Sequence, residues 1–197
     1  MEKDMIVLCM IGAFVLGSVP FGLIVARTKG IDLRKVGSGN IGATNVLRSV
    51  GKWAALFTLA GDMLKGVLAV ILARHLSLGE SAVGLIGIFA ILGHDFSLFT
   101  RFKGGKGVAT SLGVLLVYSP AVGGASVAIW IIALAVWKYS SLSALMAFFF
   151  VPLDIYLFDY SANKLIFGII IMLLMIYKHK GNIERLIKGT EPGIIKK

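Results

Sequence analysis

The chain has 197 residues, of which 57% are hydrophobic and 15% charged, and its mean hydropathy is +0.90. This composition excludes an ordinary soluble globular protein and predicts one membrane-embedded domain over residues 1–197. The formal net charge is +10, and the single Cys9 excludes a disulfide framework within the chain.

The first apolar stretch, residues 6–26, contains 21 residues without a charge. That length suits a hydrocarbon core of about 30 Å, so it predicts a membrane-spanning helix. The acidic start "MEKDM", with no A-x-A site after it, argues against a cleaved signal peptide. Six further spans follow, which gives an all-α polytopic protein with seven: residues 53–73, 82–99, 108–118, 121–137, 142–158 and 165–177.

The basic residues predict the orientation of these spans. With seven spans, 16 Lys and Arg residues fall on one side of the membrane and three on the other. Because short basic loops stay in the cytoplasm, we expect the N-terminus outside and the C-terminus inside. The excess positive charge therefore lies mainly in the loops on one side of the membrane and does not indicate a nucleic-acid-binding surface.

The first basic segment, residues 27–52, contains "VGSGNIGATNVLR". Its glycines match the dinucleotide pattern G-x-G-x-x-G, but that pattern needs a βαβ unit, and here a membrane span begins near residue 53. Either a solvated linker or an anion-binding loop fits better. In the second case backbone amides, small polar side chains and an arginine surround the anion; the polar candidates are Ser38, Asn40, Thr44, Asn45 and Arg48.

The second basic segment, residues 93–111, contains "FKGGKGVATS". It fails the Walker A pattern G-x-x-x-x-G-K-[ST] at two positions, because Thr100 replaces the first Gly and Gly107 replaces the Ser or Thr. Glycines still free the backbone beside Lys106, and a helix start follows, which favours a phosphate. A tight basic turn is the alternative. His94 either packs at this boundary or contacts the substrate.

The remaining polar residues divide between the tail and the spans. The tail "YKHKGNIERLIKGTEP" predicts an amphipathic helix with His179 and Asn182 on one face. Asp62 and Lys65 lie three apart within a span, and we favour a structural ion pair over a transport site. The histidines and the cysteine lack metal-ligand spacing, so no metal is expected.

Three of these sequences together resemble the motifs of the bacterial acyl-phosphate:glycerol-3-phosphate acyltransferase family, the PlsY type. They are "GSGNIGATN" with Arg48, "GHDFSLFTRFKGGKGVAT" and "KHKGNIERLIKGTE", and the resemblance covers nearly the whole chain. It implies a multi-pass enzyme of the bacterial inner membrane with its active site on the cytoplasmic face. That enzyme transfers a fatty acyl group from acyl phosphate to the 1-hydroxyl of sn-glycerol 3-phosphate, the first acylation step of phospholipid biosynthesis.

The resemblance further implies that lysophosphatidic acid and phosphate form without metal, nucleotide or another cofactor. Expected partners are both substrates, membrane lipid and the soluble enzyme that makes acyl phosphate. By motif position, the catalytic residues would be Arg48, Lys106, Ser143, His179 and Asn182. The substrate-binding residues would be Ser38, Gly39, Asn40, Thr44, Asn45, His94, Gly104, Gly105, Gly107, Ser141 and Arg185.

One departure concerns the family run Tyr-x-Ser-Leu-x-Ser, which reads "YSSLSA" here. Ala144 takes the last Ser position, so Ser141 or Ser143 would have to substitute. A diverged acyltransferase paralogue is therefore one alternative, and a transporter for a phosphate-bearing anion is another. Transporters usually place polar groups near the membrane midplane in two matching halves, whereas these polar residues gather at one face without a repeat.

Overall fold

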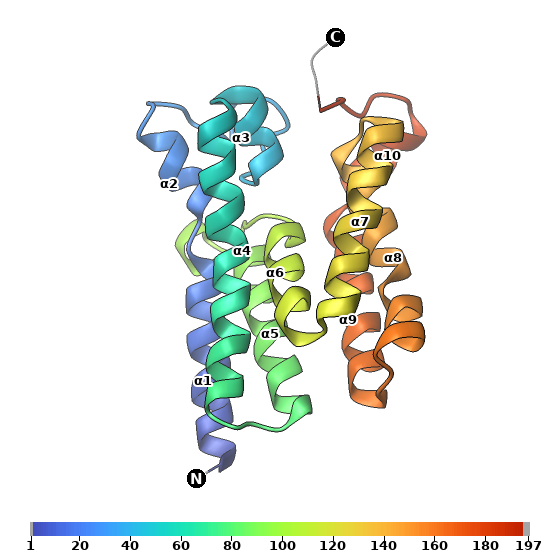
Figure 1. The fold of residues 1–197 in the computed structure, drawn as a ribbon. Helices are drawn as coiled ribbons and strands as arrows, with labels where there is room; N and C mark the ends of the chain where they lie inside the picture. Colours follow the sequence, from blue (N-terminus) through green and yellow to red (C-terminus); the bar gives the residue numbers. More distant parts are fainter. Residues whose placement is uncertain (1, 195–197) are drawn as a thin grey trace.

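The computed structural model describes residues 2–194, and within them every regular element is a helix. Figure 1 shows these helices side by side, with the N-terminus at one end of the molecule and the C-terminus at the other. The helices are α1 Glu2–Ser18, α2 Phe21–Arg27, α3 Ala43–Ser49, α4 Lys52–His75, α5 Glu80–Asp95, the 3₁₀ turn η1 Leu98–Thr100, α6 Val108–Tyr118, α7 Pro120–Trp137, α8 Ser140–Phe158, α9 Ala162–Lys178 and α10 Lys180–Ile187.

Each predicted span contains at least one helix, two of the spans (6–26 and 82–99) contain a break, and not every helix is long enough to cross a membrane. Five segments of the described chain qualify by length and hydropathy, and α9 with α10 makes a sixth if this pair, bent by 60°, is one span. Helix α6 has 11 residues, or about 16 Å at 1.5 Å per residue. The prediction that residues 108–118 are helical is confirmed. That the chain crosses the membrane seven times stays a prediction.

The first predicted span is not one helix. It breaks between Ser18 and Phe21, because Pro20 has no N–H to donate and its ring disfavours a continuing helix. The break exposes backbone groups that other elements satisfy: the Val19 carbonyl accepts a hydrogen bond from Lys65 Nζ at 3.1 Å. The Ser18 carbonyl accepts one from Ser97 Oγ at 2.5 Å. Helix α4 and Ser97, just before η1, thereby hold α1 at its break.

Close packing by glycine joins the helices in pairs. A Cβ at Gly17 of α1 would lie 2.1 Å from the Ala90 carbonyl oxygen of α5, and one at Gly93 of α5 would lie 2.2 Å from the Phe14 oxygen of α1. Helices α4 and α6 contact each other in the same reciprocal way through Gly66 and Gly113. Small residues at such crossings bring helix backbones together, as is common within membranes.

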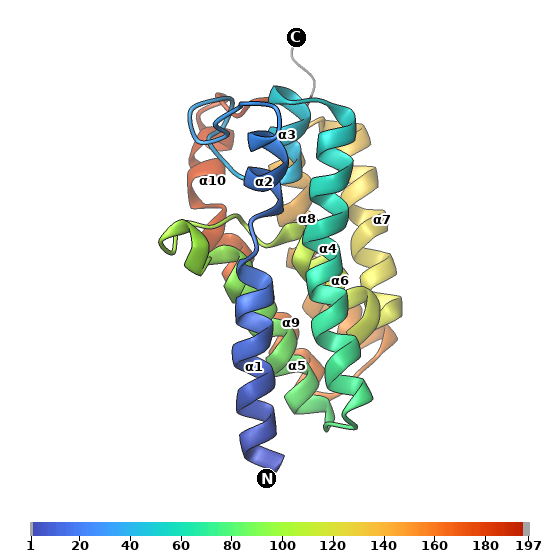
Figure 2. The same cartoon turned by 90° about the vertical axis from the view of Figure 1, so that its left-hand side faces the viewer.

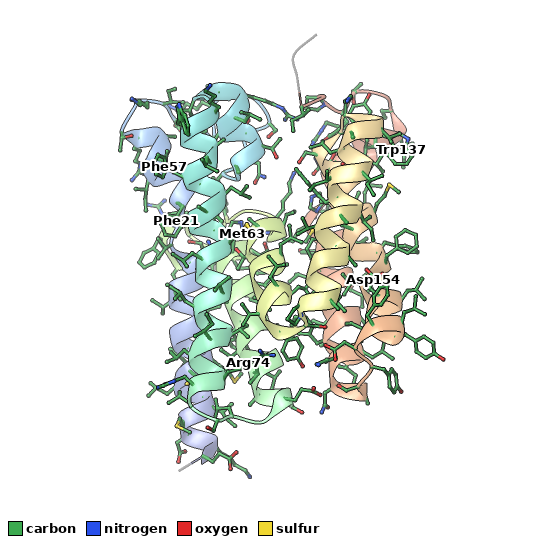
Figure 3. All side chains as sticks on the ribbon, in the orientation of Figure 1. Phe21, Phe57, Met63, Arg74, Trp137 and Asp154 are labelled. Atoms are coloured by element: carbon green, nitrogen blue, oxygen red, sulfur yellow. The ribbon has the colours of Figure 1, made fainter. Side chains whose placement is uncertain are left out.

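The short helices collect at one end of the molecule. Figure 2 shows α2, α3 and α10 at the same end of the molecule as the upper ends of α4 and α7, with α10 on the far side from α7, while α6 begins lower down, beside the middle of α4. Figure 3 places Phe57 at the upper end of α4, Met63 near its middle and Arg74 toward its lower end. The start of α6, with the glycine-rich loop before it, therefore lies below the end of the molecule where α2, α3 and α10 collect.

Candidate active site

The first basic segment folds around Asn45, near the start of α3. The side chain of Asn45 is 1% exposed, and its Nδ2 lies 2.8 Å from the Asn40 carbonyl and 3.2 Å from those of Leu33 and Val36. Its Oδ1 accepts from the Ser38 amide at 2.9 Å. The side-chain amide of Asn45 thus makes its hydrogen bonds within the loop, and so Asn45 fixes the shape of the loop that carries Ser38.

The second segment positions Lys106 at the start of α6. Gly107 precedes this helix with φ of +73°, a conformation that glycine adopts without strain. The turn exposes the first N–H groups of α6, which carry the positive end of the helix dipole. Lys106 Nζ donates to Asn182 Oδ1 at 2.5 Å, so the loop reaches α10.

Glu191, in the tail after α10, organises the far side of the site. Its Oε1 accepts hydrogen bonds from Ser141 Oγ and from Asn182 Nδ2, both at 2.6 Å. Its Oε2 accepts from Arg185 Nε at 2.8 Å. The tail is fixed in turn by Arg48, whose Nη2 donates to the Pro192 carbonyl at 3.0 Å. One buried carboxylate therefore joins α8, α10 and the tail.

Electrostatics prepare this site for an anion. Burial lowers the pKa of Lys106 to about 8, with Glu191 opposing the shift and Arg185 and Arg48 adding to it. Burial alone would raise the pKa of Glu191, but its hydrogen bonds from Ser141, Asn182 and Arg185 outweigh burial and leave that pKa below its usual value. The cluster thus holds more cations than carboxylates, and a bound phosphate would restore the protonated form of Lys106.

Two cavities meet at these residues. The inner one has a volume of about 530 Å³ and is lined by Lys106, His179 and Asn182 among others. The outer one, of about 1070 Å³, is lined by Gly37, Trp137, Tyr139 and Pro192 among others. Both cavities include Ser38, Arg48 and Glu191 in their walls.

The inner cavity has a polar end and an apolar end. Its apolar wall comes from three helices. Leu59 and Met63 belong to α4, Leu112 to α6, and Val127 and Trp130 to α7. Thr44 Oγ1 and Ser140 Oγ, 2.9 Å apart, lie on the polar part of the wall. A ligand with a phosphate head and a hydrocarbon chain matches this distribution of side chains.

Most of the site residues predicted from sequence line the inner cavity. Those that do are Ser38, Asn40, Thr44, Asn45, Arg48, His94, Lys106, Gly107, Ser141, His179 and Asn182. Those that do not are Gly39, Gly104, Gly105, Ser143 and Arg185. Among these, Gly104 and Gly105 shape the loop around Lys106, and Arg185 acts through Glu191.

The two candidate serines of α8 have different surroundings. Ser141 lines the cavity and donates to Glu191. The Ser143 hydroxyl is turned back into its own helix, where it donates to the Tyr139 carbonyl at 2.8 Å. The structure therefore does not bring Ser143 to the cavity, because two residues along an α-helix point in nearly opposite directions.

Sequence reasoning missed Glu191. It stands at the end of the third motif, after the predicted helix, where an acidic residue in a basic tail suggests only solubility. The available signal was its negative charge. In the basic tail after residue 178, the acidic residues are Glu184 and Glu191. In the structure Glu191 is 9% exposed, whereas Glu184 forms an exposed pair with Lys188. Among the described residues no group of three His, Cys, Asp or Glu could hold a metal ion.

A helical fold with membrane-length apolar segments and a phosphate-suited cavity beside an apolar wall defines a membrane protein that handles a phosphorylated lipid. Comparison with known proteins identifies the family. The family model "Glycerol-3-phosphate acyltransferase" matches residues 7–189. The chain belongs to the glycerol-3-phosphate acyltransferase family.

Individual relatives agree with this assignment. A glycerol-3-phosphate acyltransferase of Geotalea daltonii is 45% identical over 94% of this chain and 95% of its own. One from Jannaschia sp. is 51% identical over 92% of this chain and 89% of its own. The crystal structure of PlsY in its glycerol 3-phosphate form is similar with a TM-score of 0.91 and 39% identity, covering 95% of this chain and 94% of that one. The lysophosphatidic acid form gives 0.89 and 38% over the same shares.

Proposed function

We propose that this protein transfers a fatty acyl group from acyl phosphate to the 1-hydroxyl of glycerol 3-phosphate. The observation that carries this proposal is the junction at Lys106, where a basic cavity continues into an apolar wall. The solved relatives support the acceptor and the product, since they are described in glycerol 3-phosphate and lysophosphatidic acid forms. The acyl phosphate donor is our inference from the resemblance of the three motifs to the acyl-phosphate-dependent family, and the basic and apolar ends of the cavity suit such a molecule.

The two cavities give each substrate its own approach. Glycerol 3-phosphate is soluble in water, and the outer cavity between the tail and the α7–α8 turn offers it an aqueous entrance. Acyl phosphate carries a hydrocarbon chain, which the apolar wall formed by α4, α6 and α7 can receive from the membrane. The shared walls at Ser38, Arg48 and Glu191 are where the two reacting groups would meet.

In this reaction the acceptor hydroxyl attacks the acyl carbonyl carbon, forming a new C–O bond. The bond from that carbon to the phosphate oxygen breaks, and the departing phosphate takes the hydroxyl proton. The mixed anhydride is already activated, so the protein's contribution is alignment and charge stabilisation. Lys106 and Arg48 would neutralise the phosphates, Asn182 and His179 would orient them, and no covalent intermediate is needed.

The basic end of the molecule would face the cytoplasm of a bacterial inner membrane. Arg48, Lys106 and the tail all belong to the 16 basic residues that the predicted topology places on one side. The positive-inside rule supports this orientation, with seven crossings and the N-terminus outside. In this arrangement the water-soluble acceptor reaches the outer cavity, and the soluble source of the donor is on the same side of the membrane.

Turnover by the purified protein tests the proposal. The enzyme in detergent or lipid mesophase is given glycerol 3-phosphate with either acyl phosphate or acyl-CoA, and both phosphate and lysophosphatidate are measured. We expect one phosphate per lysophosphatidate with acyl phosphate and no product with acyl-CoA. Product from acyl-CoA alone would overturn the donor assignment, and no product from either donor would overturn the enzyme itself. Lys106→Ala serves as the inactive control.

A further inference from the structure

The loop that carries Lys106 rests directly on His94. The Gly105 amide donates to the His94 carbonyl at 3.0 Å, and a Cβ at Gly104 would lie 2.0 Å from that same oxygen. A Cβ at Gly105 would lie 2.0 Å from Nε2 of the imidazole and 2.9 Å from both neighbouring ring carbons. Glycines at 104 and 105 therefore let the loop lie against both the backbone and the ring edge of His94.

The opposite edge of this ring is held by a buried ion pair. His94 Nδ1 lies 2.8 Å from Lys65 Nζ and 3.4 Å from Asp62 Oδ1. Lys65 Nζ also donates to Asp62 Oδ1 at 2.8 Å and to the Val19 carbonyl at 3.1 Å. A lysine ammonium has three N–H donors and no acceptor, so all three donors of Lys65 are engaged. The ring is thus clamped between the ion pair and the loop.

Stability alone does not account for this cluster. Lys65 is 1% exposed and Asp62 is 2% exposed, and burying such a pair costs several kcal/mol that apolar residues of similar size would avoid. The charged groups add directional contacts. The contacts at Nδ1 fix the orientation of the imidazole and its distance from the loop, which apolar packing would leave adjustable. The ring height in turn sets the position of Gly105, one residue before Lys106.

We propose that Asp62, Lys65 and His94 form a positioning cluster for the reaction, which fixes the height of the 104–107 loop and so aims the Lys106 ammonium at its phosphate. In this cluster His94 supports the loop: its Nδ1 lies 2.8 Å from Lys65 Nζ, its backbone carbonyl accepts from the Gly105 amide, and the Nε2 edge of its ring packs against Gly105. The inference rests on the proposed function, because it assigns the loop a catalytic alignment.

A compensating pair of substitutions tests the proposal. Gly105→Ala places a methyl group where Nε2 now lies, and so pushes the loop away from its support. His94→Asn keeps a polar group near Nδ1 for Lys65 but leaves a gap beneath Gly105. In the double variant the new methyl group fills that gap. Gly124→Ala, whose Cβ would meet nothing within 4 Å, is the matched control.

We expect each single variant to lower kcat per folded enzyme by roughly 100-fold, the effect of a misplacement of about 1 Å in an active site. The double variant should return to within about 10-fold of the wild type, a strongly non-additive result. A double variant as impaired as the product of its singles would overturn the proposal, because a substrate-contacting imidazole is not restored by a methyl group. Inactive wild-type enzyme in the same assay would instead refute the proposed function.

A second pair of substitutions tests the role of the ion pair between Asp62 and Lys65. Lys65→Met combined with Asp62→Asn removes both charges without leaving one unpaired, which keeps the folded state accessible. We expect its kcat per folded enzyme to fall by roughly 10- to 100-fold, with folded protein measured by thermal unfolding in detergent. Wild-type kcat in this double variant would show that the pair is structural only and would remove Asp62 and Lys65 from the positioning cluster.

Discussion

Replacing Glu191 with Gln removes a charge from the site while it keeps the size and one acceptor of the side chain. Two hydrogen bonds, of 2.5 and 2.6 Å, connect Lys106 through the Asn182 amide to Glu191. With the dimensions of an amide group, these place the carboxylate roughly 7 Å from the ammonium. Opposite charges at that distance attract by roughly 2 kcal/mol at an effective dielectric constant of about 20.

This attraction stabilises the protonated form of Lys106, so its loss must lower the pKa of that lysine. Since about 1.4 kcal/mol corresponds to one pK unit, and solvent in the outer cavity screens part of the attraction, we expect a fall of about one unit from the present value of about 8. In the proposed reaction the protonated form of Lys106 is the active one, and therefore we expect the alkaline limb of kcat/KM to move to lower pH. At pH 8 the protonated fraction would fall from about one half to about one tenth.

The assay is kcat/KM for glycerol 3-phosphate between pH 6 and 9, because this parameter reports the free enzyme. Glu191→Gln should match the wild type most closely near pH 6 and be roughly five-fold slower than it at pH 8. Glu184→Gln is the matched control, since Glu184 lies on α10, before the tail that carries Glu191, in an exposed pair with Lys188. An alkaline limb that stays at the wild-type pH in Glu191→Gln would refute the electrostatic link to Lys106.

The other predictions use the remaining walls of the site. Lys106→Ala should abolish turnover and leave the thermal unfolding temperature unchanged. Arg48→Lys should raise KM for the phosphate substrates by roughly 10-fold, because it loses the planar guanidinium fork; steady-state kinetics measure this. Asn45→Ala should lower the free energy of unfolding by about 1–3 kcal/mol, followed by thermal unfolding in detergent. Val127→Trp should narrow the apolar wall and shift preference toward shorter acyl chains, shown by competition between donors of different length.

Local patterns in the sequence predicted the helices well, because a membrane requires long apolar runs and such runs are visible without tertiary information. The span at residues 108–118 has the bounds of α6, and that at 142–158 lies within α8. The exception was residues 6–26, where hydropathy outweighed a visible helix breaker, Pro20. The break is stabilised by Lys65, 46 residues along the chain, which donates a hydrogen bond to the Val19 carbonyl; no local pattern reveals this partner.

The same limit explains which cavity-lining residues the sequence did not reveal. A loop built from glycines and one lysine is a local feature, so Lys106 and Gly107 were predictable from the sequence. Choosing between Ser141 and Ser143 required the rotation of α8 about its axis, which depends on packing against other helices. Glu191 required knowing that the tail returns to α8 and α10, where Ser141 and Asn182 donate to it.

The buried polar groups approach the 104–107 loop from two sides, and the two sides belong to different kinds of element. Beneath the loop, Asp62, Lys65 and His94 belong to long helices and are almost wholly buried. Above it, Asn182 belongs to the short helix α10 and Glu191 to the tail, next to the outer cavity. A substrate phosphate can therefore displace the Asn182 contact of Lys106 while the support from His94 stays fixed. Substitutions above the loop should then act mainly on KM and on pH dependence, and those beneath it on kcat, since alignment belongs to the transition state and binding to both states.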